Sequence, residues 1–134
     1  MTITDLRVGL ATNLATISGL RTAAEIPDNP SPPIAVVQLQ SVGYDNTFQQ
    51  GMTTYNFLVS VIVGRAAERE AQRRLDSFAS SSGSESIKLA VQSDRTLGGN
   101  AYDVRVSEMS NIGAVLLGEA TYLAADFVVT VLAN

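Results

Sequence analysis

The chain contains no cysteine and no histidine, and Lys88 is its only lysine. Without cysteine it can form neither a disulfide nor a thiolate metal site, and it has no thiol nucleophile. Without histidine it lacks the side chain that most often serves as general base and as zinc ligand. A Ser-His-Asp triad is therefore excluded. A serine–lysine pair would have to use Lys88, which we place on the exposed surface of a helix.

Charge is scarce as well. Charged residues make up 16% of the 134 residues, against about 25% in ordinary soluble domains. Because charge is depleted in the cores of protein interfaces, this deficit favours an assembling protein, although a neutral polar surface would give the same composition. The net charge of −4 argues against binding to the phosphate backbone of nucleic acid, which requires a basic face.

Long apolar runs are also missing. No window approaches the ~18 consecutive apolar residues of a membrane span, and residues 1–20 show no basic flank leading into an apolar run. We therefore expect no membrane contact and no secretory signal. Residues 1–134 have about the usual size of a single domain.

The spacing of apolar residues predicts three helices. Thr4 is expected to cap the first, whose apolar stripe recurs every four residues, at Leu6, Leu10 and Leu14. A second helix is expected over residues 66–78, with Glu70 and Arg74 as an i, i+4 ion pair. Ser84 is expected to cap a short third helix.

Alternation predicts four strands, over residues 34–42, over residues 54–63, beginning at residues 104–106, and over residues 122–132. In the clearest of them the apolar face is formed by Tyr55, Phe57, Val59, Val61 and Val63. Its second face is mixed, as expected if it is half solvated or meets a partner. Strands in adjacent pairs favour a mainly antiparallel sheet. The expected fold class is α+β, with two layers and the helices packed on one face of the sheet.

Catalytic patterns are not found. The candidate carboxylates are too scattered in sequence to form an acid–base pair: Asp94, Asp103, Glu108 and Asp126. We expect Asp126 to be exposed or to pair with an arginine across an interface. Gly113 and Gly118 have the spacing of the first half of a P-loop, but Glu119 and Ala120 stand where lysine and serine or threonine are required. We therefore expect a protein that is not an enzyme and binds no metal or cofactor.

Four segments, taken in order, resemble one protein family. The first runs from Gly19-Leu20-Arg21 to Ile34-Ala35-Val36-Val37; the second comprises Tyr44-Asp45-Asn46-Thr47-Phe48, Tyr55-Asn56-Phe57 and Val61-Ile62-Val63-Gly64-Arg65; the third Gln72-Arg73-Arg74-Leu75-Asp76 and Ser86-Ile87-Lys88; the fourth Asp94-Arg95-Thr96-Leu97-Gly98-Gly99. Together they resemble the tail terminator proteins of long-tailed (siphovirus) bacteriophages, especially those that infect actinobacteria.

The resemblance implies a structural protein of the virion, located at the tail–neck junction and assembled in the host cytoplasm. Such proteins form a ring, commonly a hexamer, that caps the head-proximal end of the tail tube and ends its polymerisation. The implied partners are further copies of the chain, the tail tube protein and a head–tail stopper or connector protein. DNA would pass through the ring without specific binding, which the acidic balance suits.

Two groups of residues are the expected contact sites. The first is the long tip of the β-hairpin that we expect the strands over residues 34–42 and 54–63 to form, with Tyr44, Asp45, Phe48, Gln49, Gln50 and Met52. Tyr44, Phe48 and Met52 would be its apolar anchors, because aromatic residues dominate interface hot spots. The second group comprises Arg65, Arg69 and Arg73, expected in ion pairs between subunits. A solvated polar loop and solvated arginines are the plain alternatives.

Other functions remain open at this point. A head–tail stopper or a tail completion protein would share the size, acidity and lack of catalytic groups. A small ligand-binding domain, with the mixed sheet face lining a pocket, is an alternative of a different class. An enzyme is the least favoured alternative.

Overall fold

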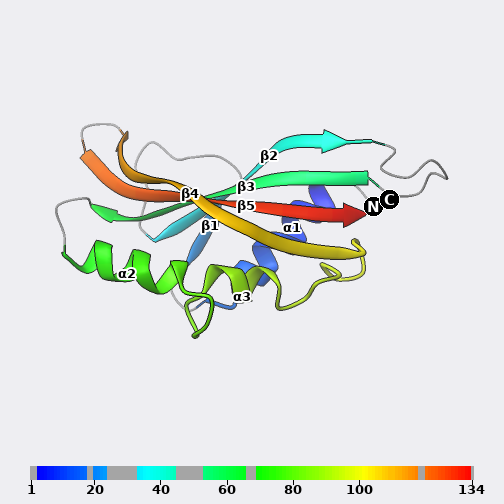
Figure 1. Cartoon of the computed structure of the whole chain (residues 1–134), viewed down its shortest axis with the longest axis horizontal. Helices are drawn as coiled ribbons and strands as arrows, with labels where there is room; N and C mark the ends of the chain where they lie inside the picture. Colours follow the sequence, from blue (N-terminus) through cyan, green and yellow to red (C-terminus); the bar gives the residue numbers. More distant parts are fainter. Residues whose placement is uncertain are drawn as a thin grey trace.

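The described residues fold into three helices and five strands (Figure 1). The computed structural model describes residues 3–17, 20–23, 33–44, 53–65, 69–117 and 120–133. In chain order the elements are α1 (Ile3–Leu14), β1 (Arg21–Ala23), β2 (Ile34–Gly43), β3 (Thr53–Arg65), α2 (Arg69–Ala79), α3 (Ile87–Val91), β4 (Asp103–Leu117) and β5 (Ala120–Ala133).

The strands form one sheet in the order β1-β2-β3-β5-β4. The pairs β2–β3, β3–β5 and β5–β4 are antiparallel, whereas β1 runs parallel to β2. The mainly antiparallel sheet is therefore confirmed. The short strand β1 was not predicted, because three residues are too few to show a strand's alternation. β4 was predicted only at its start, yet it extends over 15 residues.

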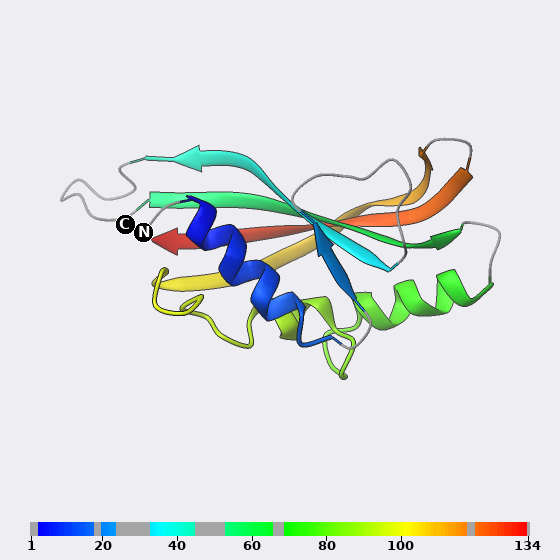
Figure 2. The same ribbon diagram turned by 180° about the vertical axis from the view of Figure 1, so that it is seen from behind.

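The three helices pack on one face of the sheet. Their buried side chains share a single core cluster with the strands; the helical members are Leu6, Leu10, Leu14, Ala71, Leu75, Phe78, Ile87, Ala90 and Val91. In Figure 2, α1 lies obliquely across this face, while α2 and α3 follow its border. The two-layer α+β architecture is thus confirmed. None of the described helices has the length and apolar character that a membrane span requires.

β3 shows why the two faces of the sheet differ. Its alternate residues from Tyr55 to Val63 are buried against the helices, as the pattern predicted. The opposite side, called the second face here, carries half-buried residues of mixed polarity: Thr54, Asn56, Leu58 and Ser60. Near the end of β3 the second face has a small apolar cluster of Ile34, Ile62, Tyr122 and Ala124, to which no described helix contributes.

The helix starts differ slightly from the prediction. α1 begins at Ile3, so Thr4 lies in its first turn and does not cap it. Ser86, and not Ser84, caps α3, because its hydroxyl directly precedes the helix and accepts a hydrogen bond from the Leu89 backbone N–H at 3.2 Å. The second helix was expected over residues 66–78; residues 69–78 are confirmed as helix, and residues 66–68 lie outside the described residues.

Candidate interaction surface

Tyr44 is the one member of the predicted hairpin tip that the structure describes. It follows the end of β2, and its side chain is 74% exposed. Such an exposed aromatic ring has the character of an interface anchor. The other predicted members, Asp45, Phe48, Gln49, Gln50 and Met52, lie outside the described residues. The predicted contact of this tip with a neighbour or the tube therefore stays a prediction.

The predicted arginines lie at the other end of the sheet. Arg65 ends β3, Arg69 begins α2, and both are exposed, as is Arg73. Glu70 pairs with Arg73 at 3.3 Å, and both side chains are 76% exposed; the sequence had predicted Arg74 as its partner. A solvated pair of this kind contributes about 0–1 kcal/mol to stability, so Arg73 remains available to an ionic partner on another chain.

Tyr44 and Arg65 lie too far apart to belong to one continuous contact patch. Tyr44 follows Gly43, which pairs with Thr54 at the start of β3, whereas Arg65 stands at the end of the same strand. At the usual rise per residue these ends are roughly 40 Å apart. Tyr44 and Arg65 therefore stand at opposite ends of the sheet, after the end of β2 and at the end of β3 respectively (Figure 1).

A third exposed group, on β4, was missed by the sequence analysis. Ile112 is 57% exposed, Val115 38% and Leu116 69%. The glycine spacing in this segment was tested only as a phosphate-binding loop, but Gly113 lies within the strand and pairs with Ala124 of β5. The signal that could have revealed a strand is the continuous apolar run after Gly113.

Asp126 lies on the second face and is half-buried, so the expectation that it is exposed was wrong. Ser60 Oγ donates a hydrogen bond to Asp126 Oδ1 at 2.7 Å, and Asn111 Nδ2 donates to Oδ2 at 3.0 Å. Asn111 adopts a φ of 54° within a bulge of β4. The carboxylate thus joins three strands and fixes this bulge. A pairing with an arginine across an interface stays a prediction.

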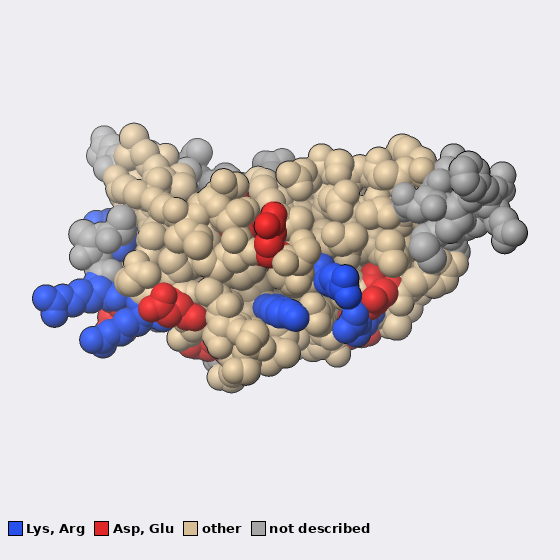
Figure 3. Space-filling view, in the orientation of Figure 1, with Lys and Arg blue, Asp and Glu red and all other residues tan. Residues whose placement is uncertain are grey.

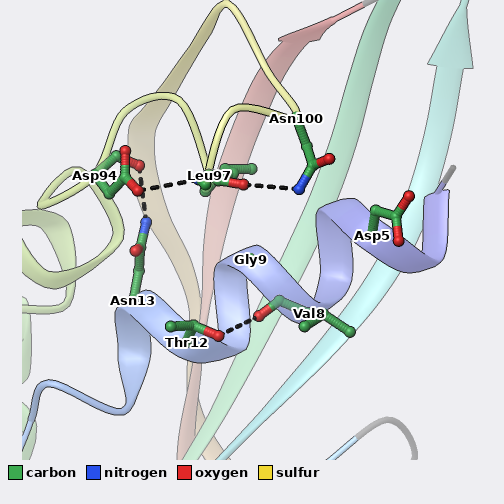
Figure 4. A pocket seen from close by; sticks show the side chains of 9 residues that line it. Asp5, Val8, Gly9, Thr12, Asn13, Asp94, Leu97 and Asn100 are labelled. Atoms are coloured by element: carbon green, nitrogen blue, oxygen red, sulfur yellow. Dashed lines mark hydrogen bonds between the residues drawn. The ribbon is translucent and has the colours of Figure 1, made fainter. Parts of the chain in front are cut away.

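The loop after α3 is held against α1 by polar contacts (Figure 4). Asn13 is buried, and its Nδ2 donates to the backbone oxygens of Val91 at 2.8 Å and Asp94 at 3.0 Å. The Asp94 carboxylate accepts hydrogen bonds from the Thr96 hydroxyl at 2.7 Å and from the Gly98 N–H at 3.0 Å. These bonds, with one from the Thr96 N–H, hold the pKa of Asp94 below its ordinary value.

One ion pair closes the same loop onto the start of β4. Arg95 Nε donates to Asp103 Oδ1 at 2.6 Å, and Arg95 Nη2 donates to Oδ2 at 3.0 Å. This two-point contact lowers the pKa of Asp103 and raises the pKa of Arg95. Among the described residues, no group of three or more potential metal-ligating side chains lies together.

The described hollows are small. One of about 230 Å³ lies between α1 and the loop over residues 94–100. Another, of about 370 Å³, lies on the second face, between Asp103, Arg105 and Ser107 of β4 and Thr130 of β5. Ligand pockets commonly measure about 300–1,000 Å³ and are mostly apolar. Val104 and Leu132 line the larger hollow together with these charged and hydroxyl side chains. Its volume lies at the lower end of that range and the smaller hollow lies below it, so the hollows give little support to the ligand-binding alternative.

The comparisons with known proteins give no relative. The chain matches no family model, and no curated protein matches its sequence. The function is therefore inferred from the chain's own residues, their arrangement and the resemblance described above.

Proposed function

We propose that this chain is a structural protein of a phage virion. In this proposal it forms a ring on the head-proximal end of the tail tube, ends tube polymerisation and offers the surface that joins the head. The observation that supports the proposal most is the exposed, weakly charged part of the sheet. Ile112, Val115 and Leu116 of β4 are exposed; Val115 pairs with Tyr122 on the second face, where no described helix packs, whereas its neighbour Leu116 points to the opposite side.

The distribution of charge agrees with an assembling protein. On the second face, β2 and β3 carry no charged residue between Ile34 and Arg65 among the described residues. Figure 3 shows few charged side chains over the middle of the sheet, while lysine, arginine and acidic residues gather toward the ends and the lower border of the view. Because interface cores are depleted in charge, the central surface suits burial against another subunit.

The proposed mechanism is a mismatch between two surfaces of one ring. A growing tube exposes groups that accept the next ring of tube subunits. The terminator ring covers these groups with one surface and presents a different surface toward the head. Growth then ends because no tube subunit matches the outer surface. Head-to-tail contacts between identical chains close into a ring when the rotation per subunit divides a full turn.

The test is a tube-capping assay with the tail tube protein encoded in the same genome. Tube protein is polymerised with and without this chain, and tube lengths and tube ends are examined by electron microscopy. We expect shorter tubes that bear extra density at one end. Unchanged lengths and bare ends at a molar excess of the chain would refute the proposal. A chain that binds only tubes already capped by another protein would instead be the stopper.

A further inference from the structure

The two halves of the edge strand β4 are protected differently. In the first half, Gln92 Oε1 accepts a hydrogen bond from the Val106 backbone N–H at 3.1 Å, which covers an edge group of the strand. Asp103 and Arg95 add an ion pair at 2.6 Å. Natural proteins shield sheet edges in these ways, with charge or with covering groups, because an open edge templates pairing with another chain. The first half is therefore closed to a further strand.

The second half lacks this protection. Residues 112–117, called the distal edge here, begin within the second bulge of β4, and from Gly113 to Leu117 they pair regularly with β5. The distal edge contains no charged residue. Ile112 and Leu116 are more than half exposed, at 57% and 69%. Among the described residues no strand lies beyond it. An exposed apolar edge of this kind is typical of a strand that is paired in the assembled protein.

The opposite edge of the sheet offers a matching segment. β1 pairs with only Ile34, Ala35 and Val36 of β2. Residues 37–42, called the β2 edge here, have no outer strand partner among the described residues. The β2 edge is also uncharged, with the sequence Val-Gln-Leu-Gln-Ser-Val. One chain thus carries two uncharged open edges, and no like charges oppose their pairing.

The directions of these edges suit each other. Three successive antiparallel pairings, β2–β3, β3–β5 and β5–β4, make β2 and β4 run in opposite directions. A second copy in a similar orientation would therefore add its β2 to this β4 as an ordinary antiparallel pair. Along the strand direction, the β2 edge lies beside the first half of β3, whereas the distal edge lies at the level of the last half of β3.

This diagonal placement shifts each copy along the strands. The offset between the two edges is roughly six residues, or ~20 Å at the rise of a strand. Sheets that close on themselves require such a stagger between successive strands. The diagonal arrangement therefore supplies the stagger that a closed, tilted sheet requires.

We propose that the distal edge of β4 pairs with the β2 edge of a second copy of this chain, and that repetition of this contact closes the ring. The inference deepens the proposed function, because it names the contact through which the ring forms. The contact is heterologous: each copy uses one edge toward each neighbour. It joins sheets directly and requires neither the tip at Tyr44 nor the arginines of α2.

The experiment compares three lysine variants of the full chain. Leu116→Lys charges the distal edge. Gln40→Lys charges the β2 edge at a residue that lies in a bulge, opposite no residue of β3. Val8→Lys is the matched control, because Val8 is an apolar residue of α1 with 58% exposure. Circular dichroism and urea unfolding establish that each variant is folded before its mass is measured by sedimentation and light scattering.

We expect the mass of the unaltered chain and of Val8→Lys to rise with concentration from 14.2 kDa toward a closed ring. Each edge variant alone should stay monomeric. An equimolar mixture of the two edge variants should give a dimer and nothing larger, because each variant retains the edge that the other has lost. Dimers of Gln40→Lys alone would refute the head-to-tail contact, since they would show pairing between two β4 edges.

Two further outcomes would also overturn the inference. One is an unaltered chain that stays monomeric at every concentration, and the other is a Leu116→Lys variant that assembles like the control. The capping assay distinguishes a failure of the proposed edge contact from a failure of the proposed function. If Leu116→Lys caps tubes normally, the function stands and the contact is wrong. If the chain assembles through its edges but leaves tubes uncapped, the contact stands and the function is wrong.

Discussion

Replacing Asn13 should destabilise the protein, because its side chain is the polar link between α1 and the segment after α3. Asn13 is 5% exposed. Its Nδ2 group donates to the backbone oxygens of Val91 and Asp94 at 2.8 and 3.0 Å. A leucine at this position would fill much of the same space but would leave both oxygens without this donor. An aspartate would place a carboxylate against two carbonyl oxygens.

The magnitudes follow from the two hydrogen bonds. Each contributes about 0.5–1.5 kcal/mol net, so Asn13→Leu should lower the free energy of unfolding by about 1–3 kcal/mol. Asn13→Asp should cost about 3 kcal/mol or more at neutral pH, because breaking a buried polar contact with an uncompensated charge is costlier. Its deficit should shrink as the pH falls, since a protonated carboxyl can again donate one hydrogen bond.

Urea unfolding followed by circular dichroism measures both effects as shifts of the midpoint. The control is Thr12→Ala, which removes an exposed hydroxyl that donates only to the Val8 oxygen within α1, at 2.8 Å. It should change the unfolding free energy by less than about 0.5 kcal/mol. An Asn13→Asp variant as stable as this control at neutral pH would refute the role given to Asn13.

Two further predictions concern the contacts of the same loop. An added Cβ at Gly9 would lie 2.8 Å from Leu97 Cβ, whereas one at Gly113 would meet no atom within 4 Å. Gly9→Ala should therefore lower the free energy of unfolding in urea by about 1–3 kcal/mol. Gly113→Ala is the control and should change it little. Arg95 holds the pKa of Asp103 below its ordinary value of 3.8, so its contribution to stability is present above that value and lost as the pH falls through the lowered pKa. Between about pH 6 and about pH 2, the thermal stability of Asp103→Asn should fall less with acid than that of the unaltered chain. An identical fall in both proteins would refute a stabilising role for the ionised Asp103.

The sheet and its layers were predictable where one periodicity ran without interruption. β3 alternates from Tyr55 to Val63, and its burial follows that alternation as far as Val61, beyond which Ile62 is buried too, in the apolar cluster of the second face. β4 was predicted only at its start because its alternation is broken twice, by register shifts between Val106 and Glu108 and between Ser110 and Gly113. A bulge inserts a residue and reverses the faces of all that follow, so a pattern search that expects one period loses the strand there.

The contact residues were less predictable, because their positions depend on pairings between distant segments. The predicted tip between residues 42 and 54 implied that Tyr44 and Arg65 lie at opposite ends of one strand, but only the observed pairing of β2 with β3 shows it. The sequence also could not decide between Arg73 and Arg74 as the partner of Glu70, because residues three and four positions away are both neighbours on a helix.

The distal edge shows most clearly what sequence alone cannot give. Residues 109–118 contain no charge and are bounded by Glu108 and Glu119, which by itself is typical of a strand buried in the middle of a sheet. The strand order places this segment at the rim instead, with Leu116 more exposed than buried at 69%. An apolar run in the centre of a sheet is explained by the core of its own chain. At the rim the same run lacks that explanation, and burial against another chain supplies it.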